Sequence, residues 1–158
     1  MMRALFLLAL AGSLAVALTA DDVAEEARAL PSGAGKELVV KVCLECHGTG
    51  HFRGQRLTPD DWSDKAYDMI DRGAKANDDQ VAAVVAYLAK NFGKDSKVLV
   101  NTAPLVELKS VLGFTVAESE AVLAYRKEHP PFQDWRDLLK VPAIDPTKVE
   151  AKKDLMAF

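Results

Sequence analysis

The stretch Cys43-Leu44-Glu45-Cys46-His47 determines how the rest of the sequence is interpreted. Two cysteines three positions apart, followed directly by histidine, are typical of c-type haem attachment. Residues i and i+3 of a helical turn lie on one face, so both thiols can add to vinyl groups of the same porphyrin. The histidine is then placed to donate a ring nitrogen to the iron. We therefore predict one covalently attached haem c, bound by Cys43, Cys46 and His47.

The sequence contains no other cysteine, which limits the alternatives. Half a zinc site needs a second pair of ligands, and a thioredoxin-type redox pair needs a βαβ pattern. Neither is visible in the sequence. A bare disulfide or a partial metal site is the interpretation that remains if no haem is attached.

Length and composition restrict the class of protein. A chain of 158 residues has room for one ordinary domain or two small ones. A charged fraction of 27% and a formal net charge of −3 exclude a strongly basic nucleic-acid binder and a disordered acidic tail. The sequence offers no nucleophile–base pair, nucleotide loop or second metal cluster, so we do not expect an enzyme.

Residues 1–20 have the layout of a secretory signal peptide. They contain the single positive residue Arg3 and a long apolar run, and small residues precede the acidic pair Asp21-Asp22. Cleavage fits after Ala20 or at Ala15-Val16-Ala17. An uncleaved membrane anchor is the alternative, although the apolar run is short for a span. We predict export to the periplasm, with no transmembrane segment after cleavage, and an exported location suits covalent haem.

Helix signals occur along the whole sequence, and no alternating strand pattern of useful length is present. Side-chain caps for helix starts are offered by Ser32, Thr58, Asn77, Thr102 and Thr115. Asn77 and Thr115 also have capping-box partners three residues later, and Pro59 follows Thr58 at a first helical position. Residues 51–56 are expected to form a loop. We predict an all-α fold.

Residues 31–93 resemble class I cytochromes c. The resemblance is carried by the Cys43–His47 motif, by Gly35 eight residues before the first motif cysteine, and by Tyr87 in the segment AYLAKNFG. In that family the glycine lets the N-terminal helix pack closely on the C-terminal helix. Val39 stands where the family commonly has an aromatic residue. The resemblance implies a small helical haem domain that carries electrons.

A second axial ligand for the iron is predicted by elimination. Of the four methionines, Met1 and Met2 leave with the signal peptide and Met156 lies in the second segment, which leaves Met69. A thioether sulfur is a suitable soft ligand for haem iron, so we predict that His47 and Met69 bind the metal. Two alternatives stay open. Met69 can simply fill the core, and His51 is a rival, although it follows His47 by only four residues.

Other residues of this segment have two interpretations each. Phe52, Trp62 and Tyr67 can line the haem pocket or serve as ordinary core residues. Arg53 and Arg56 can pair with haem propionates or lie in a solvated loop.

Residues 94–158 resemble the tandem helix-hairpin-helix domain of periplasmic competence proteins that hold incoming DNA. The matching residues are Asn101-Thr102-Ala103, Ala124-Tyr125-Arg126, Phe132 and Asp137-Leu138-Leu139. The resemblance implies two helical hairpins that follow each other along the chain.

The DNA-binding function of that family is not expected to transfer. Its hairpins approach the DNA backbone through glycines that let main-chain N–H groups face a phosphate. The first hairpin keeps Gly113 but has Thr115 at the second glycine position, and the second hairpin has Ala143 and Asp145. Ten basic and ten acidic residues in this segment leave no surplus of positive charge for phosphates. We predict a helical docking module and do not expect DNA as a partner.

The predicted organisation has four parts: a signal peptide (1–20), an N-terminal arm (21–30), a cytochrome c domain (31–93) and a helix-hairpin-helix domain (94–158). A polar joint at residues 93–97 marks the last boundary. We predict an exported monohaem c-type cytochrome that carries electrons between redox partner proteins. The alternatives are a haem-linked periplasmic DNA-binding protein and a haem enzyme or sensor with an open iron site.

Overall fold

The computed structural model describes residues 20–158, so the predicted signal peptide and the alternative of an uncleaved anchor lie almost entirely outside the described residues. Within residues 20–158, no helix combines the length and the apolar character that a membrane crossing requires.

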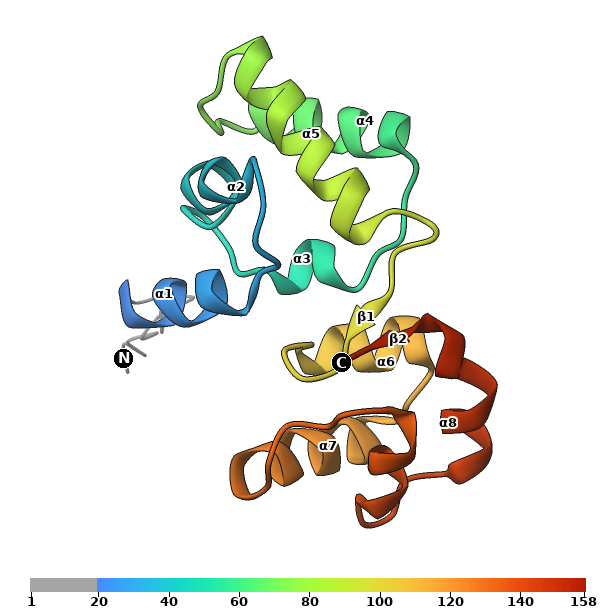
Figure 1. Ribbon diagram of the computed structural model, residues 1–158. Helices are drawn as coiled ribbons and strands as arrows, with labels where there is room; N and C mark the ends of the chain where they lie inside the picture. The colour runs from blue at the N-terminus through green and yellow to red at the C-terminus, as the bar shows by residue number, and fades with distance from the viewer. Residues whose placement is uncertain (1–19) are drawn as a thin grey trace, which may run out of the picture.

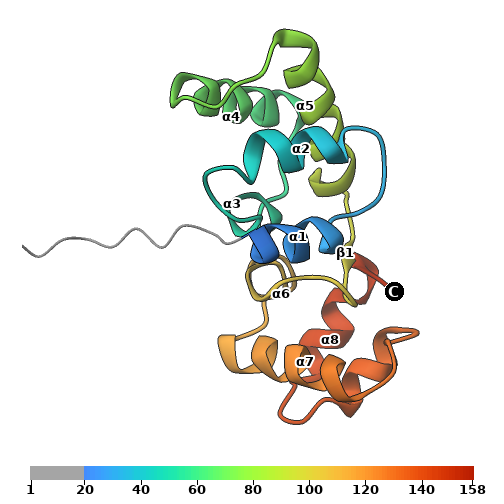
Figure 2. The same ribbon diagram turned by 90° about the vertical axis from the view of Figure 1, so that its left-hand side faces the viewer.

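The all-α prediction is confirmed (Figures 1 and 2). The first group of helices comprises α1 (Ala20–Ala29), α2 (Lys36–Cys43), α3 (Gly50–Arg53), α4 (Pro59–Asp71) and α5 (Asp78–Phe92). The second comprises α6 (Leu105–Leu112), α7 (Val116–Glu128), the 3-10 helix η1 (Trp135–Lys140), α8 (Pro146–Lys152) and the 3-10 helix η2 (Lys153–Leu155). Two short parallel strands, β1 (Val98–Leu99) and β2 (Met156–Ala157), bring the C-terminus back beside the joint between the groups.

Each group of helices encloses its own hydrophobic core. The first core contains Leu30, Val39, Leu44, Phe52, Trp62, Val84, Tyr87, Leu88 and Phe92. The second contains thirteen buried residues. Six of them that are less than 3% exposed are Val98, Leu108, Phe114, Val122, Leu138 and Val149. In Figure 1 the two groups lie one above the other, and the yellow joint runs between them.

The close approach expected at Gly35 is present. Gly35 has a φ of +90°, and a Cβ atom there would lie 2.7 Å from the carbonyl oxygen of Ala83 and 2.9 Å from Cβ of Tyr87. Tyr87 is 1% exposed, and its hydroxyl donates to the carbonyl of Pro31 at 2.6 Å. Only glycine allows both this left-handed backbone and this proximity, so Gly35 fixes the packing of α2 on α5.

Helix starts follow the predicted caps in three cases and differ in two. Complete capping boxes occur at Thr58, Asn77 and Thr115. Helix α2 begins after Gly35 instead of after Ser32, because the left-handed backbone at Gly35 lies between them. Helix α6 begins after Pro104 instead of after Thr102, since the N–H groups of Thr102 and Ala103 both close a turn on Leu99. Part of the loop expected at residues 51–56 is also helical, as α3.

The two hairpin tips share one backbone conformation. Gly113, between α6 and α7, has a φ of +73°, and Ala143, between η1 and α8, has a φ of +63°. Ala143 is the only residue other than glycine with a positive φ among residues 20–158. A side chain at such a φ costs about 1–2 kcal/mol. The tip of the second hairpin therefore has the left-handed backbone that favours glycine, but the residue there is Ala143.

Glu118 joins the two hairpins. Its buried carboxylate accepts the main-chain N–H of Thr115 at 2.6 Å, the main-chain N–H of Asp145 at 3.1 Å and the ammonium of Lys148 at 2.7 Å. Burial alone would raise the pKa of this carboxyl, but the hydrogen bonds from Lys148 and the main chain outweigh it and lower the pKa to about 2. Glu118 is thus a charged link between the N-termini of α7 and α8.

Replacing Ala143 by glycine is expected to stabilise the protein. Glycine removes the strain of the left-handed backbone, but it also gives the unfolded chain more conformational entropy. Because the first effect is larger, the free energy of unfolding should rise by about 0.5–1 kcal/mol. Denaturant unfolding followed by circular dichroism measures this gain. The control is Ala124→Gly on the exposed side of α7, which should destabilise by about 1 kcal/mol. A loss of stability in Ala143→Gly would contradict the assignment of strain.

Candidate functional site

The four residues singled out as haem-binding in the sequence line one cavity of about 530 Å³. Cys43 is the last residue of α2, Cys46 and His47 lie in the turn that follows it, and Met69 comes from α4. Residues that are 22 or more positions apart thus meet on the same cavity. The packing of α4 against α5, both started by capping boxes, places the methionine there.

The walls of the cavity are mainly apolar. They include Val42, Phe52, Trp62, Ala66, Ile70, Val81, Val84 and Leu88. Trp62 is held in place because its indole N–H donates to the carbonyl of Phe92 at 3.2 Å. Charged lining residues, which are Lys65, Asp68 and Arg72, are exposed. The cavity therefore suits a largely apolar group with a polar edge.

The ring of His47 is oriented by a main-chain contact. Its Nδ1 atom lies 3.2 Å from the carbonyl oxygen of Gly48. A carbonyl only accepts hydrogen bonds, so this contact assigns the ring hydrogen to Nδ1 and leaves the lone pair on Nε2. This is the tautomer that a histidine needs in order to bind a metal through Nε2.

The two thiols differ in environment. Cys43 is half-buried and Cys46 is exposed, and both are free. Burial raises the pKa of the Cys43 thiol to about 11. The first cysteine of the motif is therefore protonated in ordinary buffers.

His51 lies beside His47. The centroids of the two rings are 4.4 Å apart, and both residues line the cavity. The four-residue separation in sequence thus places the two imidazoles next to each other on one cavity.

The aromatic residues considered for the pocket divide into two groups. Phe52 and Trp62 line the cavity, and both are also part of the first hydrophobic core. Tyr67 does not line it; its side chain is 45% exposed, and its hydroxyl contacts a carboxylate oxygen of Asp78 at 3.4 Å. On α4, Tyr67 lies on the solvent side while Ala66 and Ile70 face inward.

The interpretation of Arg53 and Arg56 is corrected. Neither lines the cavity or lies in a solvated loop. The Nε atom of Arg53 donates to Glu107 at 2.9 Å, and Nη2 of Arg56 donates to the same carboxylate at 2.7 Å. Arg53 and Glu107 are both 1% exposed. The helical turn of α3 directs Arg53 toward α6, and nothing in the spacing of the sequence pointed to Glu107.

Two known protein families match this chain, one over each of the two groups of helices. Residues 32–88 match the family model described as cytochrome c oxidase, cbb3-type, subunit III. Residues 93–156 match the helix-hairpin-helix motif. The first match implies haem c binding, and it covers the turn after α2 and most of α4 and α5.

A curated relative matches part of the chain. ComE operon protein 1 from Bacillus subtilis (strain 168) is 39% identical over 61 residues, which are 39% of this chain and 30% of that protein. The match therefore spans less than a third of the relative's length. No solved structure gives a significant match.

The burial of Cys43 predicts unequal alkylation in protein produced without haem attachment. At about pH 8, a pKa of about 11 instead of 9.0 lowers the thiolate fraction of Cys43 roughly a hundredfold. Iodoacetamide should therefore label Cys46 well before Cys43, and Cys43 should gain reactivity only as the pH approaches 11. Peptide mass spectrometry measures both rates, with the urea-unfolded protein as the control. Faster labelling of Cys43 in the folded protein would refute the prediction.

Proposed function

We propose that this chain, which joins a cytochrome c segment to a helix-hairpin-helix segment, is an exported electron carrier with one covalently attached haem. Cys43 and Cys46 would hold the haem by thioether bonds, and His47 and Met69 would bind its iron. The helix-hairpin-helix segment would dock a redox partner. The proposed location is the periplasm, which the signal-peptide pattern of residues 1–20 supports.

The observation that carries the proposal is the convergence of two thiols, an imidazole and a thioether on one mainly apolar cavity. The donor set fits haem c, because thiols bond covalently to the porphyrin while imidazole and thioether are common iron ligands of electron-carrying cytochromes. The cavity volume of about 530 Å³ lies within the range of cofactor pockets. The hydrogen bond from His47 to Gly48 supports the role of Nε2 as a ligand atom.

When bound, haem supplies one-electron iron chemistry. The side chains of this protein set its surroundings. Trp62, Val84 and Leu88 exclude water from the cavity, which is one of the means by which a protein adjusts a reduction potential. Two protein ligands on the iron favour electron transfer over reaction with a substrate.

The C-terminal segment is proposed to bind protein and not DNA. In DNA-binding hairpins, main-chain N–H groups at the helix N-termini face a phosphate. Here the N–H groups of Thr115 and Asp145 already donate to Glu118, whose negative charge occupies the space between the hairpins. Asp145 adds a second carboxylate at the tip, which is hydrogen-bonded to Thr147.

DNA binding is the second candidate function. The match to the helix-hairpin-helix motif favours it, as does the similarity to ComE operon protein 1. In that case the haem would be attached to a nucleic-acid-binding module. A haem enzyme or sensor with an open iron position is the third possibility.

Replacing Met69 by leucine is expected to remove the sixth ligand while keeping the bulk of the side chain. The holoprotein should change from a low-spin to a high-spin spectrum and lose the weak far-red band of thioether-bound iron. The reduction potential should fall by an amount on the order of 0.1 V, within the roughly 0.8 V that axial ligands span. Visible spectroscopy and a redox titration measure these changes.

The matched control is Ile70→Ala, which removes side-chain bulk from the same cavity wall and leaves the sulfur in place. Its spectrum should stay low-spin. An unchanged spectrum in Met69→Leu would show that Met69 is not a ligand. Carbon monoxide binding by the reduced wild-type protein without ligand displacement would favour the open-site alternative.

A mobility-shift assay separates the docking module from a DNA-binding module. The full-length protein should not shift a DNA duplex even at low salt, where attraction to phosphates is strongest, because the C-terminal segment has no excess of positive charge and Glu118 occupies the hairpin N–H groups. A shift that weakens steeply as salt is added would instead support the DNA-binding candidate.

A further inference from the structure

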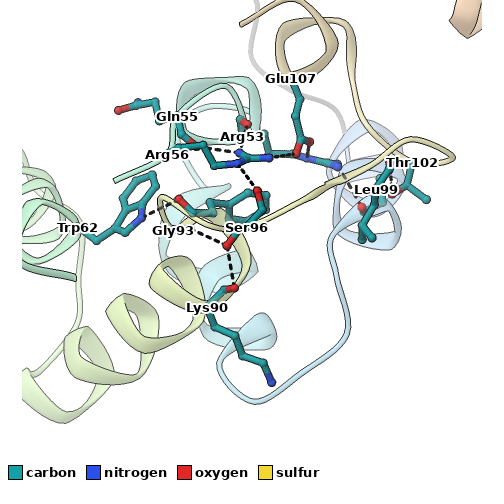
Figure 3. A network of polar contacts seen from close by, with 12 residues as sticks. Arg53, Gln55, Arg56, Trp62, Lys90, Gly93, Ser96, Leu99, Thr102 and Glu107 are labelled. Carbon is teal, nitrogen blue, oxygen red and sulfur yellow. Dashed lines mark hydrogen bonds and ion pairs between the residues drawn. The ribbon is translucent and has the colours of Figure 1, made fainter. Parts of the chain in front are cut away.

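The contact between the two groups of helices is built around a buried charged network (Figure 3). Glu107 of α6 accepts from Arg53 through one oxygen and from Arg56 through the other. Arg53 also donates to the carbonyl of Ala29 at 3.1 Å, and Arg56 donates to the carbonyl of Ser96 at 3.0 Å. One carboxylate of the C-terminal segment thus connects to the end of α1, to α3 and to the joint between the segments.

The same network reaches the wall of the cavity. Helix α3 contributes His51 and Phe52 to the cavity lining, and Arg53 is the next residue. Phe52 packs edge-on against Phe92, with ring centroids 5.5 Å apart, and the guanidinium of Arg56 lies 5.8 Å from the same Phe92 ring. A displacement of either arginine would therefore move groups that enclose the cavity.

Helix α6 also packs directly on the end of α3. A Cβ atom at Gly54 would lie 2.9 Å from Cγ2 of Val106, so a side chain there would force the Val106 side chain or α6 to move. Gly54 has a φ of −78°, an ordinary value for any residue. Glycine is thus favoured at this position by the neighbouring helix and not by its own backbone.

The charges in the network depend on one another. Burial is the main cause that lowers the pKa of Arg53, and Glu107 acts against it. A third guanidinium, that of Arg126 on α7, has a pKa lowered to about 10 by burial and by Arg53, which Glu107 again opposes. Removal of Glu107 would leave buried positive charges without their carboxylate, which is one of the costliest changes in a protein interior.

We propose that Glu107 is a positioning residue for the haem cavity: from the C-terminal segment it holds Arg53 and Arg56, and through them the α3 wall beside His47. The C-terminal segment is then a structural part of the haem site as well as a docking module. Because coupling between two sites is reciprocal, a partner that shifts α6 would change the reduction potential. This inference rests on the haem site of the proposed function.

The test uses full-length holoprotein and the variant Glu107→Gln. Hydrogen exchange at the amides of Phe52 and Arg53, which both donate to the carbonyl of Thr49, should become roughly tenfold faster or more. The reduction potential should shift as well. The control is Glu120→Gln, an exposed glutamate on α7, which should change neither quantity.

A second variant separates positioning from a direct effect of charge. Gly54→Val changes no charge but drives α6 away from α3 through the contact with Val106. It should also accelerate exchange in α3 and shift the potential. Unchanged exchange and potential in both variants would overturn the inference, and a shift of potential in Glu107→Gln alone would reduce the role of Glu107 to its charge.

Haem content keeps this inference distinct from the proposed function. It is measured from the spectrum of the denatured, reduced protein. Absence of covalent haem from the wild-type protein would refute the proposed function, whereas normal haem content with unaltered exchange and potential in the variants would refute only the role of Glu107.

Discussion

The contact of Glu107 with Arg53 and Arg56 is the interaction on which the arrangement of the two segments depends. Taking one carboxylate and two guanidiniums out of water is expensive, and good geometry must offset the cost. Here both carboxylate oxygens are used, and further guanidinium N–H groups donate to the carbonyls of Ala29, Ser96 and Gln55. The surplus of positive charge is thus shared with main-chain oxygens. A contact of this kind tolerates little displacement, so it specifies one orientation of α6 on α3.

Glu118 solves a similar problem within the C-terminal segment. It is one of two buried glutamates there, and like Glu107 it connects pieces that come from different parts of the chain. The partners of Glu107 are cationic side chains, whereas Glu118 mainly receives main-chain N–H groups at helix N-termini, where a negative charge is favoured. The two carboxylates therefore make contacts at two levels: Glu118 lies between the hairpins, and Glu107 lies between the C-terminal segment and α3.

Sequence reasoning was most successful where the cause is local. Capping boxes at Asn77 and Thr115 follow from residue types within a few positions, and the structure contains both. The close approach at Gly35 was implied by the resemblance to class I cytochromes c, and the structure contains it as well. The Cys43–His47 motif and Met69 were selected from their chemistry, and the structure places them on one cavity. Arg53 and Arg56 were misinterpreted because their partner is more than fifty residues away. No local pattern indicates which distant carboxylate will neutralise a buried guanidinium.

The observed partners of Arg53 and Arg56 bear on the proposed function. Arginines next to a haem motif are readily assigned to the haem, yet here they face away from the cavity and bind the other segment. The haem propionates would then find no partner in Arg53 or Arg56, and the charged residues at the cavity lining are Lys65, Asp68 and Arg72 on the exposed side. A redox partner that approaches this side would meet α4, while the C-terminal segment supports the cavity through α3. In the proposed function the C-terminal segment therefore has two tasks, because it docks a partner and also supports the cavity through α3, whereas α4 supplies the exposed, charged edge of the cavity.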